Sequence, residues 1–313
     1  MYSIIIPIYN EQETVPELLR RLTAVLNGLD RPVEVLFIDD GSGDASFSML
    51  AEAHRSDPRF KVIRLSRNFG HQVAISAGID YAAGEAIMIM DGDLQDPPEL
   101  LPQFLAKWKE GHDVVFAVRR KRKEGLLKKL AYFIFYRLLQ RVAAIDIPMD
   151  SGDFSLIDRR VADVLRSMPE RRRFVRGIRS WAGFKQVGVE YERDRRFAGE
   201  AKYTPSKLSR LALDGIFSFS FAPLRLAGYT GFTISVISFA LALFYLLQKI
   251  FVGIDTKGWA STIVIILFLG GVQLLTIGII GEYIGRVYDE VKQRPLYVVS
   301  DRLGFEQNGK PLR

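Results

Sequence analysis

The sequence predicts an α/β fold with a mostly parallel β-sheet, followed by an apolar C-terminal region. Two observations predict the sheet. Short continuous runs of Val, Ile, Leu, Phe and Met recur in the N-terminal part of the chain, and amphipathic stretches separate them. Strands that are apolar along their whole length are typical of parallel sheets, whose two faces are both covered by helices. The third observation is that most of the apolar excess lies after residue 224.

The individual elements follow from these patterns. We expect strands at residues 2–8, 33–38, 61–65, 86–90 and 113–118, and a further strand around 187–197. Helical patterns fill the gaps, at residues 15–26, 45–54, 72–83 and 99–109. A helical pattern at 126–145 either packs on the sheet or lies at a membrane surface. Ligands bind beyond the carboxyl ends of parallel strands, so the polar residues that close each strand are the candidates for function.

The C-terminal region contains an amphipathic segment and two long apolar runs. Residues 206–225 combine aromatic and basic side chains, as expected of a helix at a membrane interface. Residues 229–247 and 262–280 are each long enough to cross a bilayer, since about 20 apolar residues span its core. A buried core helix would explain one such run, but not two adjacent ones. We therefore expect four regions: a folded domain at 1–205, an amphipathic region at 206–227, two transmembrane helices within 228–285 and a tail at 286–313.

Basic side chains predict the orientation of the two spans. They gather on the outer flanks of the apolar runs: Lys207, Arg210, Arg225, Arg286, Lys292, Arg294 and Arg302. The connecting loop holds only Lys249 and Lys257, partly offset by Asp255. The positive-inside rule then places the folded domain and both termini in the cytoplasm of an integral membrane protein. The N-terminus also lacks the features of a signal peptide, because its apolar run is short and is broken early by a Pro-Ile-Tyr-Asn-Glu segment.

Composition excludes several kinds of chemistry. Cysteine is absent, which excludes disulfides, thiolate metal sites and cysteine nucleophiles. The three histidines, His54, His71 and His112, are not spaced as metal ligands, so we expect oxygen atoms to hold any metal, which favours Mg²⁺ or Mn²⁺. A net charge of +7 suits an anionic lipid or a phosphate-rich ligand. We expect no nucleic acid partner, because the sequence carries no motif for one.

Acidic side chains close three of the expected strands. Asp91 and Asp93 follow the strand at 86–90, Asp39 and Asp40 close the strand at 33–38, and Glu11 follows the first strand. Carboxylates gathered in this way repel one another unless a cation or a ligand rich in donors lies among them. Asp91 and Asp93 can share a divalent cation, which in turn can bind the two phosphates of a nucleotide diphosphate. Taken alone, an Asp-x-Asp pair is weak evidence, because it also forms turns.

The combination of segments resembles a known enzyme family. Residues 7–11, 39–42 and 91–95 together resemble the family-two glycosyltransferases, whose catalytic domain has the Rossmann-like GT-A fold. Further segments, together with the two apolar runs, narrow the resemblance to the polyisoprenyl-phosphate glycosyltransferases: residues 67–72, 150–154, 196–203 and 281–286. That group includes the bactoprenol glucosyltransferases and is related to the dolichyl-phosphate mannose synthases. The resemblance covers nearly the whole chain.

The resemblance implies a role for each matching residue. A nucleotide sugar would be bound by Pro7, Tyr9, Glu11, Asp39, Asp40, Asp91 and Arg119. Mg²⁺ or Mn²⁺ would be bound by Asp91, Asp93 and Gln95. Arg196 and Lys202 would bind the donor or acceptor phosphate, although Ala201 stands where related synthases usually have Ser. Asp93 and Asp153 would be catalytic, and Asp153, expected after a Ser-Gly turn, would serve as a base or orient the sugar.

The implied reaction is transfer of a hexose, with glucose from UDP-glucose favoured, to undecaprenyl phosphate or a similar polyisoprenyl phosphate, with inversion. Mannose, N-acetylglucosamine and modified arabinose stay open as the sugar. A processive polysaccharide synthase is disfavoured because the Gln-x-x-Arg-Trp motif is absent. A catalytically silent membrane partner is disfavoured by the intact Asp91, Asp93, Gln95 and Lys202. Glycines at 270, 271, 278 and 281 would suit either a homo-oligomer or packing of the two spans within one chain.

Overall fold

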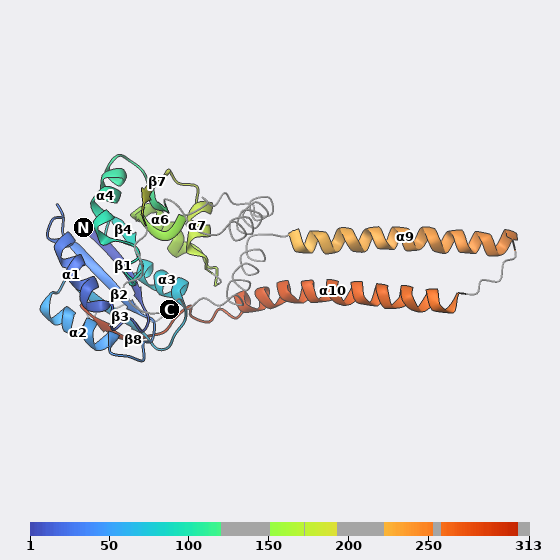
Figure 1. Cartoon of the computed structure of the whole chain (residues 1–313), viewed down its shortest axis with the longest axis horizontal. Helices are drawn as coiled ribbons and strands as arrows, with labels where there is room; N and C mark the ends of the chain where they lie inside the picture. The colour runs from blue at the N-terminus through green and yellow to red at the C-terminus, as the bar shows by residue number, and fades with distance from the viewer. Residues whose placement is uncertain (120–150, 172, 193–221, 253–257, 306–313) are drawn as a thin grey trace. The chain divides into compact units, whose positions relative to one another are not determined.

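The computed structural model of the protein describes residues 1–119, 151–171, 173–192, 222–252 and 258–305 (Figure 1). Contacts divide the chain into two units, which we describe separately. The first unit holds the sheet and its covering helices, and the described part of the C-terminal segment, 294–305, belongs to it. The second unit holds two long helices.

The first unit is built on an eight-stranded sheet with the order β7-β5-β6-β4-β1-β2-β3-β8. The strands are β1 (Tyr2–Ile8), β2 (Val33–Asp39), β3 (Phe60–Leu65), β4 (Ala86–Ile89), β5 (Val114–Arg119), β6 (Ser151–Asp158), β7 (Gln186–Tyr191) and β8 (Val299–Leu303). The neighbours β4, β1, β2 and β3 run parallel, as do β5 and β7, whereas β6 and β8 run antiparallel to the strands beside them. The expected α/β fold with a mostly parallel sheet is confirmed.

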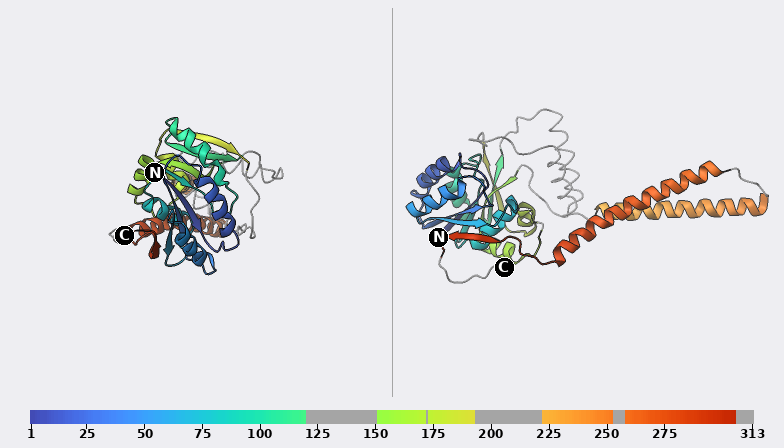
Figure 2. Two further views of the ribbon diagram at one scale, coloured as in Figure 1. Left: turned by 90° about the vertical axis from the view of Figure 1, so that its left-hand side faces the viewer. Right: turned by 90° about the horizontal axis from the view of Figure 1, so that it is seen from below.

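Helices cover both faces of this sheet (Figure 2). They are α1 (Val15–Leu26), α2 (Ser46–Ser56), α3 (His71–Tyr81), α4 (Leu101–Lys109), preceded by the short helix η1 (Pro98–Leu100), α6 (Arg159–Ser167) and α7 (Val175–Trp181). Every residue of β1 is buried, because alternate side chains meet different helices. Ile4 and Ile6 join a core with Leu22 of α1, while Ile5 on the opposite face meets α3. A Cβ at Gly78 of α3 would lie 2.2 Å from Ile5, so glycine permits the close approach of helix and strand.

The segment that begins β6 is a strand where a turn was expected. Residues 151–153 were expected to form a turn before Asp153, but they begin strand β6. The strand forms because it fills the position between β4 and β5, where Phe154 and Leu156 are buried in the core. Asp153 is therefore held by a sheet and not by a turn. The helical pattern at 126–145 lies outside the described residues.

The second unit consists of α9 (Ala222–Val252) and α10 (Trp259–Val291), which contact each other. Both are long and apolar enough to cross a membrane, over Leu224–Leu241 in α9 and Val264–Val291 in α10. Large apolar side chains on them are exposed, for example Phe232, Phe251 and Leu274. Such exposure is unfavourable in water and favourable in lipid, so a membrane environment explains it. Residues 206–221 of the expected amphipathic region lie outside the described residues.

Candidate active site

Acidic residues from three strands meet at one edge of the sheet. Because β4, β1 and β2 are neighbours and run parallel, their carboxyl ends lie side by side. Asp91 and Asp93 follow β4, Glu11 follows β1, and Asp39 and Asp40 lie at the end of β2. The sheet order therefore brings together carboxylates that are up to 82 residues apart in sequence (11 to 93). This edge is where open α/β sheets bind their ligands.

The loops after β1 and β2 are hydrogen-bonded to each other. Asn10, with a positive φ of 53°, donates its backbone N–H to Ser42 Oγ at 3.0 Å and accepts from Gly43 N at 2.9 Å. The backbone N–H of Glu11 donates to Ser46 Oγ at 2.9 Å. Tyr9, the residue before Asn10, keeps 40% of its surface exposed. Two of the expected nucleotide-binding residues, Tyr9 and Glu11, follow Pro7 of β1 and thus lie in a pair of loops that hydrogen bonds hold together, with the Tyr9 ring accessible.

Asp39 is fully buried at the end of β2. Its Oδ1 accepts from Ser42 N at 3.1 Å, and its Oδ2 lies 3.2 Å from Arg64 Nε without a well-aligned hydrogen bond. Burial raises the pKa of Asp39, while Ser42 and the charge of Arg64 oppose that change. The Arg64 guanidinium is itself held over the Phe47 ring, 4.4 Å from its centroid. The side chain of Asp39 is therefore paired within the protein.

Asp40 holds a loop. Its two carboxylate oxygens accept from the backbone N–H groups of Phe69 and Gly70, at 2.7 and 2.9 Å. Burial raises the pKa of Asp40, and these two hydrogen bonds oppose it. Gly41 lies against the same loop with a φ of +70°, and a Cβ there would be 2.5 Å from the carbonyl carbon of Arg67. Asp40 therefore shapes the loop at 66–70, and this contributes to its expected role in nucleotide binding.

Asp91, Asp93 and Gln95 lie in a sharp turn after β4. Asp93 is only 7% exposed, and its Oδ1 accepts from Gln95 N at 3.1 Å. Leu94 takes a positive φ of 59°, which is uncommon for a residue with a side chain. Within the described residues, no three acidic or histidine side chains converge closely enough to hold a metal ion. Mg²⁺ is commonly bound by one or two carboxylates together with substrate phosphates, so the oxygen ligands of this turn fit that cation.

A second group of polar side chains surrounds Asp153 at the start of β6. Gln72 donates from Nε2 to Asp153 Oδ2 at 2.8 Å and accepts from Val175 N at 2.8 Å. Arg176 Nε lies 3.6 Å from Asp153 Oδ1, and His71 Nε2 lies 3.7 Å from Oδ2. We call His71, Gln72, Asp153 and Arg176 the Asp153 cluster. It joins the first turn of α3, the start of β6 and the first turn of α7.

The Asp153 cluster is linked to the turn after β4 through His71, whose Nε2 also lies 3.4 Å from Asp91 Oδ1. Burial opposes a charge on the His71 ring, but the nearby carboxylates of Asp153 and Asp91 outweigh it and raise the pKa of His71 to about 9. Because 43% of the His71 side chain is exposed, water screens part of this attraction. His71 therefore carries positive charge between two carboxylates at neutral pH.

Asp153 stays ionised. Burial alone would raise the pKa of Asp153, but His71, Arg176 and Gln72 together hold it well below its usual range. Arg179, 1% exposed and near Asp153, adds a further positive charge, since burial lowers its pKa only to about 10. A carboxylate with a low pKa is a weak proton acceptor. This environment favours a carboxylate that orients a ligand over one that removes a proton.

Several expected site residues have no described side chain. Arg119 ends β5, where its backbone pairs with Tyr191, and its side chain is not described. Arg196 and Lys202 lie outside the described residues. Their roles stay predictions. Two members of the Asp153 cluster were not predicted in their place. Gln72 had no predicted role, and its only signal was its position in the segment 67–72 that carries the family resemblance. Arg176 was expected, as part of a basic run with 171–173 and Arg179, to attract anionic lipid or the acceptor phosphate, and the structure places it beside Asp153.

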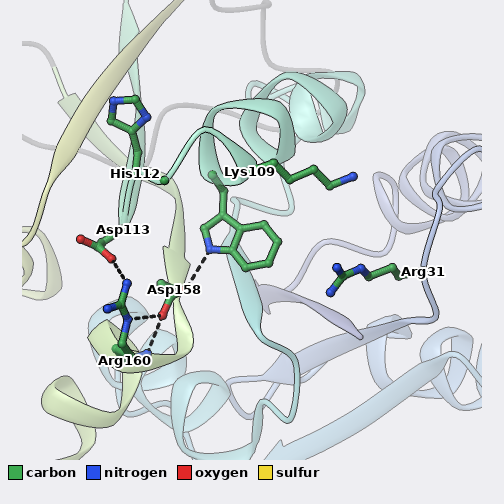
Figure 3. A pocket seen from close by; sticks show the side chains of 8 residues that line it. Arg31, Lys109, His112, Asp113, Asp158 and Arg160 are labelled. Atoms are coloured by element: carbon green, nitrogen blue, oxygen red, sulfur yellow. Dashed lines mark hydrogen bonds and ion pairs between the residues drawn. The ribbon is translucent and has the colours of Figure 1, made fainter.

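A separate pocket lies at the opposite end of the sheet (Figure 3). Its residues Asp113 and Asp158 lie before β5 and at the end of the antiparallel strand β6, away from the carboxyl ends of β4, β1 and β2. Arg160 joins the two carboxylates, at 2.5 Å from Asp113 and 3.3 Å from Asp158, and Trp108 donates to Asp158 at 2.8 Å. These pairings satisfy the two carboxylates within the protein, and the other polar side chains of the lining, Arg31, Lys109 and His112, are bonded to Glu85, Asp30 and the Lys107 carbonyl. We therefore place the active site at the carboxyl edge and not in this pocket.

The mostly parallel sheet with helices on both faces is that of a glycosyltransferase domain with the GT-A fold. Residues 3–166 match the model of glycosyl transferase family 2, and residues 222–287 match that of the GtrB C-terminal hairpin. The chain therefore belongs to glycosyl transferase family 2, and the resemblance stated from the sequence is confirmed. The second match covers most of α9 and α10, so the helical unit is a C-terminal hairpin of a known type.

Relatives match along nearly the whole chain. An uncharacterised glycosyltransferase of Bacillus subtilis, YkcC, is 51% identical over 306 residues, which cover 97% of this chain and 95% of the relative. A prophage bactoprenol glucosyl transferase homologue of Escherichia coli is 41% identical over 298 residues, covering 95% and 97%. Among solved structures, a mycobacterial protein is 16% identical, with a TM-score of 0.48 over 70% of this chain and 74% of that one, and this likeness adds nothing to the family match.

Proposed function

We propose that the protein transfers a sugar from a nucleotide diphosphate donor to a polyprenyl phosphate. One observation carries the proposal: the same chain contains a family 2 glycosyltransferase domain and two helices apolar enough to cross a membrane. A membrane hairpin keeps an enzyme where a lipid acceptor is found. The names of relatives such as the bactoprenol glucosyl transferase of Shigella phage SfII, 41% identical over 298 residues, support the same acceptor.

The donor lies at the carboxyl edge of the sheet. Tyr9 offers an exposed ring on which a nucleobase can stack, and the loops held by Asp39 and Asp40 form the adjoining wall. Pro7 would contribute from the end of β1, and Glu11 from the loop that follows it. The family resemblance favours UDP-glucose over GDP-mannose, UDP-N-acetylglucosamine and modified arabinose donors. Arg119, Arg196 and Lys202 would bind the donor and acceptor phosphates, as the resemblance implies.

Asp91, Asp93 and Gln95 would hold Mg²⁺ or Mn²⁺. Their oxygen atoms suit a hard cation, and a pair of carboxylates leaves room for phosphate oxygens in its coordination shell. The cation would neutralise charge on the departing diphosphate. Asp93 is almost buried and its carboxylate accepts from Gln95 N, so this carboxylate needs little reordering when the donor binds.

Asp153 orients the sugar in this proposal. Gln72 hydrogen-bonds one of its oxygens, and cationic groups lie within 3.7 Å of both, so Asp153 is ionised and poorly suited to accept a proton. The reaction needs no strong base, because the acceptor phosphate is already ionised near neutral pH. Its oxygen attacks the anomeric carbon as the bond to the diphosphate breaks, which leaves the nucleoside diphosphate and a glycosyl phospholipid. Attack opposite the leaving group would invert the configuration.

A transfer assay tests the proposal. Purified protein in detergent is given undecaprenyl phosphate, Mg²⁺ or Mn²⁺ and, in separate tubes, radiolabelled UDP-glucose, GDP-mannose and UDP-N-acetylglucosamine. We expect label in the organic phase with one donor, and loss of that label when EDTA removes the metal. If no donor labels the lipid while a bactoprenol glucosyl transferase does so in parallel, the proposal is wrong. Donor hydrolysis in the same tubes then separates a different acceptor from a silent protein.

A further inference from the structure

The C-terminal segment returns to the sheet as its edge strand. β8 pairs antiparallel with β3, with Val62 opposite Leu303, Ile63 opposite Arg302 and Arg64 opposite Asp301 (Figure 1). Without β8, the backbone N–H and C=O groups on that side of β3 would lack strand partners, which is unfavourable at a sheet edge. Only residues 292–298 separate the end of α10 from this strand. The chain thus places a strand of its catalytic unit directly after its second apolar helix.

The contacts of this segment concentrate where β3 enters the active-site loop. The register shifts between Arg64 and Leu65, so that Ser300 is the extra residue of a bulge. The single proton of Ser300 Oγ is shared between two acceptors, the Arg64 carbonyl at 3.3 Å and Asp301 Oδ2, in the strand itself, at 2.9 Å. One residue further on, the backbone N–H of Ser66 donates to the Val298 carbonyl at 2.8 Å. Bulges redirect side chains locally, and this one lies at Arg64, the residue that pairs with Asp39.

The loop at 66–70 is therefore held at both ends. Val298 fixes its start through Ser66, and Asp40 fixes its end through the N–H groups of Phe69 and Gly70. Both aspartates that close β2 thus depend on groups that contact the C-terminal segment. Asp39 does so through Arg64, and Asp40 does so through the loop.

Side chains anchor the same segment to the last turn of α3. Tyr297 donates its phenol to Asp80 Oδ2 at 3.0 Å, and the Phe305 ring meets Tyr81 edge-on with centroids 5.5 Å apart. Burial and the charge of Asp80 raise the pKa of Tyr297, so the phenol keeps its proton for this bond. These anchors lie on both sides of β8, which indicates a specific docking and not a loose tail.

We infer that each chain's own C-terminal segment, residues 297–305, positions the nucleotide end of its donor site by holding Arg64 and the loop at 66–70. The inference rests on the proposed function in that the donor is a nucleotide sugar bound beside Asp39 and Asp40. It assigns positioning roles to Tyr297 and Ser300, which touch neither substrate nor the expected metal ligands. The segment after the membrane hairpin is then part of the enzyme's donor site.

Paired substitutions test the positioning role. Tyr297→Phe with Ser300→Ala removes the hydrogen bond from Tyr297 to Asp80 and the hydroxyl that contacts the Arg64 carbonyl and Asp301. The matched control is Tyr2→Phe with Ser167→Ala, since Tyr2 donates to Asp30 at the same 3.0 Å at the other end of the sheet and Ser167 donates to a carbonyl of α6. We expect the first pair to raise the donor KM and the Kd for UDP about tenfold, with kcat within about twofold, as the loss of one to two hydrogen bonds allows. Equal effects of both pairs, or a fall in kcat at unchanged KM, would overturn the inference.

The absence of cysteine allows a second, activity-independent test. Val62→Cys with Leu303→Cys places two thiols opposite each other across β3 and β8, at a separation that antiparallel strands can bridge. We expect oxidation to give a disulfide within one chain, seen as a faster band on a non-reducing gel. A covalent dimer would show that the strand comes from another copy, and no disulfide would show that β8 does not dock on β3. Either result overturns the inference.

Combining the two tests separates positioning from general loss of structure. In the Tyr297→Phe, Ser300→Ala background, the disulfide should return the donor KM to within about twofold of the parent, and reduction should raise it again. If the unmodified protein binds UDP and transfers sugar but the substitutions change neither KM nor Kd, the inference fails and the proposed function stands. If the unmodified protein neither binds UDP nor transfers sugar, the proposed function fails, while the disulfide result still reports whether the strand docks.

Discussion

At the scale of single residues, the site depends on side chains that have two partners. Gln72 uses one end of its amide on Asp153 and the other on the backbone of Val175, so it fixes the distance between β6 and α7. Nothing in the local sequence around Gln72 points to position 153 or 175. Such pairings are set by the sheet order and become visible only in the folded chain, whereas the strand-closing carboxylates could be read from the sequence.

Replacement of Gln72 by Ala should impair catalysis more than donor binding. The change removes the amide hydrogen bond to Asp153 Oδ2, which keeps His71 beside it, and leaves the buried Val175 N–H without its partner, which costs about 1–3 kcal/mol. We expect kcat to fall about 10- to 100-fold if all of that loss appears in the transition state, with donor KM within about threefold. Steady-state kinetics of lipid labelling measure both, with the exposed Gln103→Ala on α4 as control. A rise in KM at constant kcat would contradict the orienting role of Asp153.

Asp93→Asn should abolish transfer while the protein stays folded. The amide keeps an oxygen that can accept the Gln95 N–H but loses the charge that a divalent cation needs. We expect at least a hundredfold loss of lipid labelling, and a Kd for Mn²⁺ in the presence of UDP that rises at least tenfold by titration calorimetry, roughly the range for lost metal ligands and their partners. The exposed Asp163→Asn on α6 serves as control. Retained activity in Asp93→Asn would contradict the metal site.

At the scale of elements, the helices and strands made of apolar runs were predictable, and the strands that form only by pairing with a distant part of the chain were not. The first strand and first helix, Tyr2–Ile8 and Val15–Leu26, have the expected bounds, because a continuous apolar run and a 3.6-residue period are local signals. β6 and β8 were missed. β6 mixes polar and apolar residues, and β8 is an exposed edge strand, so each depends on a partner distant in sequence. The bulge at Arg64 follows from the same distant pairing.

Gly41→Ala should displace the loop at 66–70 as a unit. A side chain at position 41 is strained by the φ of +70°. Its Cβ would also lie 2.5 Å from the backbone of Arg67, and this clash persists because a backbone atom, unlike the end of a side chain, cannot move aside. We expect the free energy of unfolding of the catalytic unit to fall by about 2–3 kcal/mol, and UDP binding to weaken. Thermal unfolding and UDP titration measure the two effects. Gly43→Ala, where a Cβ meets nothing within 4 Å, is the matched control and should change little.

At the scale of the whole molecule, orientation in the membrane follows from charge and not from the fold. The described helices α9 and α10 show only that two segments can cross a membrane. The distribution of Lys and Arg around them predicts that the catalytic unit, β8 included, is cytoplasmic and that the connection at 253–258 faces outward. This orientation also gives the enzyme access to nucleotide sugars, which are made in the cytoplasm.

Single cysteines in this cysteine-free chain test that orientation. Gly258→Cys, at the start of α10, should react with a membrane-impermeant maleimide in intact spheroplasts, because the outward connection is exposed to the reagent. Lys292→Cys, just after α10, should react only after the membrane is opened, because the positive-inside rule holds that flank in the cytoplasm. Gel mobility after labelling measures both. Labelling of Lys292→Cys in intact spheroplasts would place the catalytic unit on the outer side, away from its donor, and the proposed reaction would lose its supply of nucleotide sugar.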